Sequence, residues 1–214
     1  IDDLNTDLTR QAGADIFAGG ALSVLASNAS TSQSIAGAIA ISGVGAEGAS
    51  GSIGASVSYT YLGDDPTSSD LSINTIRAAI TNLTGSLVAA SLEVNATDDA
   101  TIFNVSVAGA AAGNFALGAS VSINHINNQT EAYILGSGTV TTSATSPATP
   151  GAGIHVQAKD QSDIQAIAGG FSLAIDVNKP AAAAFGVSVA INEITGTTTA
   201  YIDGVSVISV GDIV

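Results

Sequence analysis

The sequence predicts an all-β fold, an elongated parallel β-helix or β-solenoid built from internal repeats. Three copies of one ten-residue pattern carry this prediction, at residues 53–62 (IGASVSYTYL), 117–126 (LGASVSINHI) and 185–194 (FGVSVAINEI). Successive copies begin 64 (117 − 53) and 68 (185 − 117) residues apart. Repetition at a fixed period is typical of stacked repeat architectures, and almost no helical periodicity interrupts it.

A second shared block follows the pattern. It starts 14 residues after the pattern begins in the second and third copies, at residues 131–134 (EAYI) and 199–202 (TAYI). In the first copy the partner, residues 77–80 (RAAI), starts 24 residues after the pattern begins (77 − 53), which predicts an insertion near residues 62–72. The chain is therefore interpreted as a single solenoid segment of a longer chain, with approximate repeats 11–98, 99–160 and 161–214.

Shorter strands recur between these patterns in the same order. Residues 154–158 align with 92–96, and residues 163–166 align with 101–104 and with 15–18. Each repeat is therefore expected to contain the same strands.

The period also predicts how the chain winds. A parallel β-helix uses roughly 20 to 25 residues per coil, so each repeat should supply about three coils and the segment about nine or ten. Residues 139–153, rich in Thr, Ser and Pro, are expected to form a loop that extends one coil. The alternative architecture is stacked antiparallel hairpins, in which residues 172–178 fold back on residues 184–192.

Alternation within the repeated pattern predicts the core. Large apolar side chains point to one face of the strand, and small Gly, Ser, Ala and Asn side chains point to the other. The large set is taken as core: Leu117, Val121, Ile123, Phe185, Val189 and Ile191. The opposite face is small and uncharged, so another layer or a neighbouring molecule could approach it closely.

The charge balance argues against partners that attract cations. The 214 residues contain 18 acidic and only four basic side chains, for a net charge of −14. Nucleic acids are bound by Lys and Arg on phosphates, and anionic membrane faces attract basic clusters, so neither partner is expected. Residues 16–46 carry no charge, but Gly and Ser interrupt them. We therefore expect no membrane insertion of this segment.

Two groups of residues are candidate sites. Asp64, Asp65 and Asp70 fall in the insertion and could bind calcium, which prefers oxygen ligands; a solvated acidic loop is the alternative. Tyr133 and Tyr201 lie in the second shared block, and their rings point outward if the adjacent Ala and Ile point inward. An exposed tyrosine row would suit contacts between molecules, and a ring lying flat over a neighbouring coil is the alternative.

The sequence predicts no catalytic centre. His125 and His155 lie in different strand types, and the chain has no cysteine. Polysaccharide cleavage on a β-helix needs clustered carboxylates, whereas the acidic residues here are scattered among turns. No enzyme activity is expected, and calcium at the acidic loop is the one cofactor considered.

The sequences GASVSIN with EAYI and GVSVAIN with TAYI, flanked by strands such as IHVQAKD, resemble the repeats of large filamentous adhesins of Gram-negative bacteria. These are the filamentous-haemagglutinin-like and leukotoxin-like β-helical exoproteins. The resemblance implies an extracellular or cell-surface stalk that mediates attachment to cell-surface or matrix components, as in biofilms. The alternative is a self-assembling extracellular fibre or sheath whose partners are copies of itself, because flat uncharged strands pack laterally. A polysaccharide-acting β-helix enzyme comes third.

Overall fold

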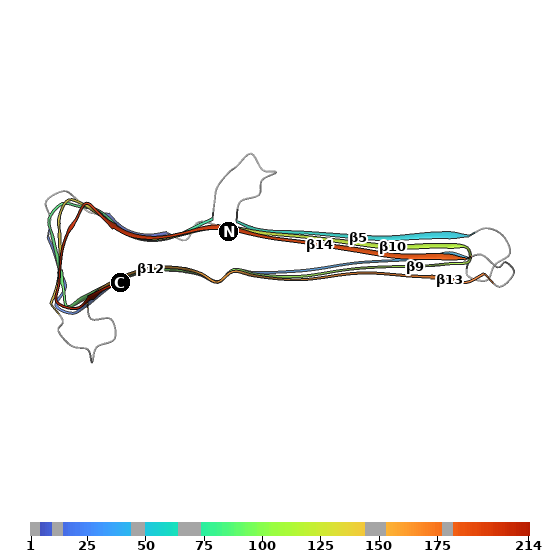
Figure 1. Ribbon diagram of the computed structural model, residues 1–214, viewed down its shortest axis with the longest axis horizontal. Coiled ribbons are helices and arrows are strands. Elements are labelled where there is room, and N and C mark those ends of the chain that lie inside the picture. Colours follow the sequence, from blue (N-terminus) through green and yellow to red (C-terminus); the bar gives the residue numbers. More distant parts are fainter. Residues whose placement is uncertain (1–4, 10–14, 44–49, 64–73, 144–152, 177–181) are drawn as a thin grey trace.

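The computed structural model describes residues 5–9 (backbone only), 15–43, 50–63, 74–143, 153–176 and 182–214 (Figure 1). Every helix or strand assigned within them is a β-strand, so the predicted all-β class is confirmed. The strands are β1 (Asn5–Thr9), β2 (Ile16–Phe17), β3 (Ala21–Asn28), β4 (Thr31–Ile41), β5 (Gly51–Gly63), β6 (Asn74–Leu83), β7 (Ser86–Ala89), β8 (Ser91–Asp98), β9 (Thr101–Ala112), β10 (Phe115–Gly136), β11 (Thr139–Thr142), β12 (Gly153–Asp160), β13 (Asp163–Ala174), β14 (Ala183–Asp203), β15 (Ser206–Ser209) and β16 (Asp212–Ile213).

The strands form four parallel sheets. Sheet A has the order β1-β6-β10-β14, with β5 also beside β10; sheet B is β15-β11-β7-β2, sheet C is β16-β12-β8-β3 and sheet D is β13-β9-β4. The register sets Gly54, Gly118 and Gly186 side by side, as the aligned patterns predicted. The alternative of antiparallel hairpins is wrong for the described residues. Strands β13 and β14 belong to different sheets, and the paired strands of all four sheets run parallel.

One repeat makes one circuit of the four sheets, because the chain visits sheets A, B, C and D in turn through β6, β7, β8 and β9 before β10 returns to sheet A. Paired glycines lie 64 (118 − 54) and 68 (186 − 118) residues apart. The expected coil of about 20 to 25 residues is therefore wrong, since only a whole-repeat offset places like side chains beside one another. In Figure 1 the paired strands nearly overlap down the shortest axis, so the stack of repeats is the thin dimension of this segment.

The predicted insertion is confirmed at the middle of sheet A. Strand β10 pairs with β5 as far as Asn127 and Gly63, and from Asn128 and Asn74 onward it pairs with β6. Two other expectations are wrong. Residues 15–18 are not the counterpart of residues 101–104, because Ile16 pairs with Leu87 and β4 takes that place. The expected loop at residues 139–153 begins instead with strand β11.

At one end of the molecule, sheets B and C and the second half of sheet A surround an apolar core; we call this part the head (Figure 1). Inward-facing Leu, Ile, Val and Ala side chains fill it because alternation along each strand turns every second residue inward. Its buried members are Val24, Ala26, Ile76, Ala78, Ile80, Leu83, Leu87, Ala89, Leu92, Val94, Ala96, Ala132, Ile134, Val140, Ile154 and Val156.

Sheet D and the first half of sheet A form two layers that extend from the head as a long, narrow part (Figure 1). We call this part the arm, and it comprises residues 33–41, 51–60, 103–112, 115–124, 165–174 and 183–192. Its interior contains small side chains, the polar ones of Ser and Asn together with an alanine cluster at Ala110, Ala112 and Ala116. Ser34 Oγ and Ser58 Oγ lie 2.8 Å apart across the two layers, and Ser56 Oγ and Ser106 Oγ lie 2.9 Å apart.

The facing predicted for the arm strands is wrong. Ser120, Ser122 and Asn124 are buried between the layers, whereas Val121 faces outward and is half-buried, and Phe185 is 55% exposed. The other predicted core residues, Leu117, Ile123, Val189 and Ile191, face outward in the same way.

The cause of this reversal is the close approach of the two layers. A Cβ on Gly118 would lie well inside 3.0 Å of the Phe171 carbonyl oxygen, and one on Gly186 would meet the Gly170 carbonyl equally closely. Only glycine fits such an approach of backbone to backbone. The large side chains of the repeated pattern are therefore displaced to the outside.

Candidate functional site

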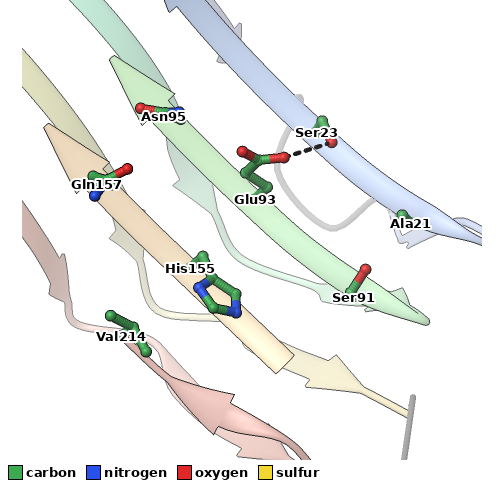
Figure 2. Close-up of a pocket in the computed structure, with 8 residues that line it drawn as sticks. All are labelled: Ala21, Ser23, Ser91, Glu93, Asn95, His155, Gln157 and Val214. Carbon is green, nitrogen blue, oxygen red and sulfur yellow. Dashed lines mark hydrogen bonds between the residues drawn. The ribbon is translucent and has the colours of Figure 1, made fainter. Parts of the chain in front are cut away.

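A polar hollow of about 370 Å³ lies on the outer face of sheet C (Figure 2). Alternation along β8 places Leu92 and Val94 in the core of the head and turns Glu93 and Asn95 outward. Parallel register then aligns the outward side chains in two rows, Ser23 with Glu93 and His155, and Leu25 with Asn95 and Gln157. The hollow is lined by Ala21, Ser23, Ser91, Glu93, Asn95, His155, Gln157 and Val214.

The first row contains the three residue types of a hydrolytic triad in the wrong order. Ser23 Oγ donates to Glu93 Oε2 at 3.3 Å (Figure 2), and Glu93 lies between Ser23 and His155 in the register. Nucleophilic catalysis needs histidine between the serine and the carboxylate. The row therefore does not support proton removal from Ser23, but its groups can exchange hydrogen bonds with a polar ligand.

A buried carboxyl lies where the arm meets the head. Asp98 is fully buried and accepts hydrogen bonds from Asn28 Nδ2 at 2.7 Å, from Asn128 Nδ2 and from Ser162 Oγ at 3.4 Å. Loss of solvent raises the pKa of this carboxyl, the three donors partly oppose that rise, and the neighbouring charge of Asp160 adds to it. The raised pKa means that this carboxyl keeps its proton to a higher pH than an exposed aspartate does.

The two predicted contact tyrosines stack on each other. Tyr133 and Tyr201 are paired in the register of β10 and β14, and their ring centroids lie 4.9 Å apart with an interplanar angle of 8°. Tyr201 is 39% exposed, while Ala132 and Ile134 are buried in the head. The outward direction of the rings is thus confirmed, and the two rings lie flat against each other across neighbouring repeats. Their use in contacts between molecules stays a prediction.

The predicted calcium ligands Asp64, Asp65 and Asp70 lie outside the described residues. Within the described ranges, no cluster of three or more His, Cys, Asp or Glu side chains has the arrangement that a metal ion needs. The calcium site therefore stays a prediction.

No known family matches this chain. The comparison with protein-family models found no match, and no curated protein and no solved structure is significantly similar to it. In the part of the chain that the structure describes, no helix has the length and apolar character needed to cross a membrane.

Two surfaces were missed from the sequence. The row of Glu93 and His155 could have been found, because the alignment of residues 92–96 with 154–158 already places these side chains together. The second surface is the outside of the arm, where Ile35, Ile53 and Phe171 are 81%, 64% and 55% exposed. No signal in one sequence distinguishes which face of an alternating strand is inside when one face is large and the other small.

Proposed function

We propose that the chain is a repeat segment of a β-solenoid, and that stacked repeats of this kind form the structural stalk of a secreted bacterial surface adhesin. One observation carries the proposal: the register of Gly54, Gly118 and Gly186 continues unchanged across both junctions between repeats. Strands β5 and β14 each leave one side of sheet A unpaired along the arm. Open parallel edges of matching sequence accept further repeats.

Side-chain ladders between repeats support the stacking. Asn124 Nδ2 donates to Asn192 Oδ1 at 2.8 Å, and the hydroxyl oxygens of Thr142 and Ser209 lie 2.9 Å apart. Both pairs occupy matching positions in adjacent repeats. Like side chains over like side chains are what a repeat array uses at each new interface.

The location and partners follow from the resemblance of the repeated sequences to filamentous adhesins. In this proposal the protein is extracellular, its full-length form attaches cells to surface or matrix components, and this segment holds the binding regions away from the cell. The segment itself has no enzyme activity in this role. Calcium bound at Asp64, Asp65 and Asp70 would be structural.

The stacking is tested by lengthening the array. Adding one copy of residues 115–182, which is one circuit from Phe115 to its partner Ala183, should thicken the particle by about 4.8 Å, the spacing of paired strands. Small-angle scattering of the chain with one, two and three added copies measures this increment. An increment of about 14 Å per copy, three strand spacings, would instead support the short coils.

The stalk role is tested on cells that produce the full-length protein. Antibodies to this segment should label intact cells, and in-frame removal of residues 115–182 should preserve both export and attachment, because the register of the remaining repeats is kept. Removal of residues 115–150 serves as the control, since it breaks the register and should abolish surface display. If the isolated segment binds matrix components as tightly as the full-length protein does, the stalk role is refuted and the segment is itself the binding region.

The runner-up function, a self-assembling extracellular fibre or sheath, is favoured by the apolar outside of the arm. A polysaccharide-acting enzyme is not favoured, because glycoside hydrolysis uses a pair of carboxylates and the sheet C row contains one, Glu93.

A further inference from the structure

The outside of the arm is apolar on both layers. The outward side chains of sheet A include Ile53, Val57, Tyr59, Phe185, Val187, Val189 and Ile191, which are 44% to 67% exposed, and those of sheet D include Ile35, Ile39, Ile41, Ile167, Phe171 and Leu173, which are 54% to 81% exposed. Contiguous exposed apolar surface of this kind marks an interaction site. We propose that a second copy of this chain covers the sheet A side of the arm, with the two heads at opposite ends of the pair.

Charge permits this pairing despite the overall acidity. The chain carries a net charge of −14, yet none of the residues assigned to the arm is Asp, Glu, Lys or Arg. Charged side chains begin only at the ends of the arm, with Glu193 and Asp163 next to the head and Asp176 near the tip. Two arms can therefore meet face to face without bringing like charges into the contact.

The evenness of the sheet A side favours it over the sheet D side. Val57, Val121 and Val189 form one outward row across the three paired strands. On sheet D two of the five outward rows of the arm contain glycine, against one of five on sheet A, and a hollow opens beside Gly37, Val107 and Phe171. A row made only of β-branched side chains suits a dry, interdigitated contact between two sheets.

The shape of the molecule sets the orientation of the pair. The head is wider than the arm in Figure 1, so two arms with their heads at the same end could not touch along their length. A two-fold axis parallel to the stack of repeats places each head beyond the tip of the other arm. The contact is then isologous, with the same face used by both copies.

A lipid phase is a poorer occupant than a second copy. Along the arm, β5 and β14 of sheet A and β4 and β13 of sheet D each have one unpaired edge. Each backbone group left without a partner in hydrocarbon costs several kcal/mol. Pairing between arms leaves those edges in water and removes only the apolar side chains from it.

The area of the contact predicts that the pair is weak and strengthens with repeat number. Residues 115–124 extend about 33 Å, and three strands cover about 14 Å, so one arm face measures about 460 Å². Two copies would together bury about 920 Å², below the roughly 1,200 Å² of a standard interface. Doubling the number of repeats doubles this contact area. Arm pairing thus rests on the proposed stacking of repeats and not on the adhesin role.

Sedimentation equilibrium of the whole chain at rising concentration tests the proposal. The parent should show a concentration-dependent dimer, and Val57→Glu with Val189→Glu should weaken its Kd at least tenfold, because two charges per copy would lose water in the contact. Leu25→Glu with Ile208→Glu adds the same charges to exposed positions of the head and should leave the dimer intact. A parent that stays monomeric, or equal loss in both variants, overturns the proposal.

Cysteine cross-linking tests the orientation, since the chain has no cysteine of its own. Leu117→Cys lies near the tip of the arm and Ile123→Cys near its base, both on the middle strand β10, which faces β10 of the other copy in either orientation. A mixture of the two variants should form a disulfide dimer, whereas each variant alone should not. Self-linking of Leu117→Cys would place the heads together and overturn the arrangement, and binding of the monomer to phosphatidylcholine vesicles would overturn it in favour of lipid. Scattering of the lengthened arrays is unaffected by any of these outcomes, so failure of the pair and failure of the stacking are distinguishable.

Discussion

Adjacent substitutions at residues 117 and 118 test the unusual facing of the arm. Gly118→Ala places a methyl group against the Phe171 carbonyl of the opposite layer, well inside 3.0 Å. Overpacking of this kind costs about 1–3 kcal/mol, while the lower entropy of the unfolded chain returns about 0.4–1 kcal/mol. The expected net loss is about 1–2 kcal/mol in the free energy of unfolding.

Leu117→Asp is the matched control one residue away. Leu117 faces outward, so in the unpaired chain, which predominates at low protein concentration, its carboxylate stays hydrated and the expected loss is below about 1 kcal/mol, as for surface substitutions. Urea unfolding followed by circular dichroism measures both variants. If Gly118→Ala unfolds like the parent while Leu117→Asp loses several kcal/mol, the facing is the one that alternation alone suggested and the account of the arm is refuted.

Three further predictions concern single polar or aromatic groups. Ser120 Oγ is buried without a hydrogen-bond partner, so Ser120→Ala should raise the free energy of unfolding by up to about 1 kcal/mol; a loss in urea unfolding would show that the hydroxyl is satisfied. The pKa of Asp98 is raised in the folded state, so the native chain binds the proton more tightly than the unfolded chain and this group's contribution to stability is lost as pH rises through the folded pKa. Asp98→Asn should flatten that dependence in melts between pH 4 and 7, and an unchanged pH profile would contradict the assignment. Changing Tyr133 and Tyr201 together to Ser removes a stacked pair and should cost about 0.5–1.5 kcal/mol while leaving arm pairing intact; loss of self-association with an unchanged melt would instead make the rings the contact surface.

The sequence predicts the repeat and its register well. The shared ten-residue pattern places Gly54 beside Gly118 and Gly186, and the larger distance from that pattern to Arg77 locates the insertion before β6. Both features are present in the strand pairing. These features depend only on the order of residues along the chain. The outward direction of Tyr133 agrees with burial of Ala132 and Ile134 in the head, but the same rule of large residues inside gave the wrong face for Ile123 in the arm.

The number of residues per circuit and the inward or outward direction of the arm side chains could not be predicted, for a physical reason. A period of 64 or 68 residues fits one wide circuit as well as several narrow ones. Alternation shows which residues of a strand share a face, but it does not show how many sheets the chain visits in one repeat. The same strand β10 has small inward residues in the arm and large ones in the head, from Ser120 to Ile134, without a change of phase. The separation of the layers, rather than the residue pattern, decides which face is inside.

The sheet C row of the candidate site shows a similar division. Glu93 and His155 could be aligned from the sequence. That Glu93 lies between Ser23 and His155 could not be inferred until the structure showed that corresponding segments of successive repeats are adjacent strands.

The wide circuit determines what this protein gains from each added repeat. With 64 or 68 residues per circuit and an advance of about 4.8 Å, a thousand residues of this design would reach only about 70 Å along the stack. The same chain in narrow coils of about 20 to 25 residues would reach roughly three times as far. Most residues of each repeat therefore run across the sheets rather than along the stack. Each added repeat enlarges the lateral surface of the array more than it increases the length of the stack.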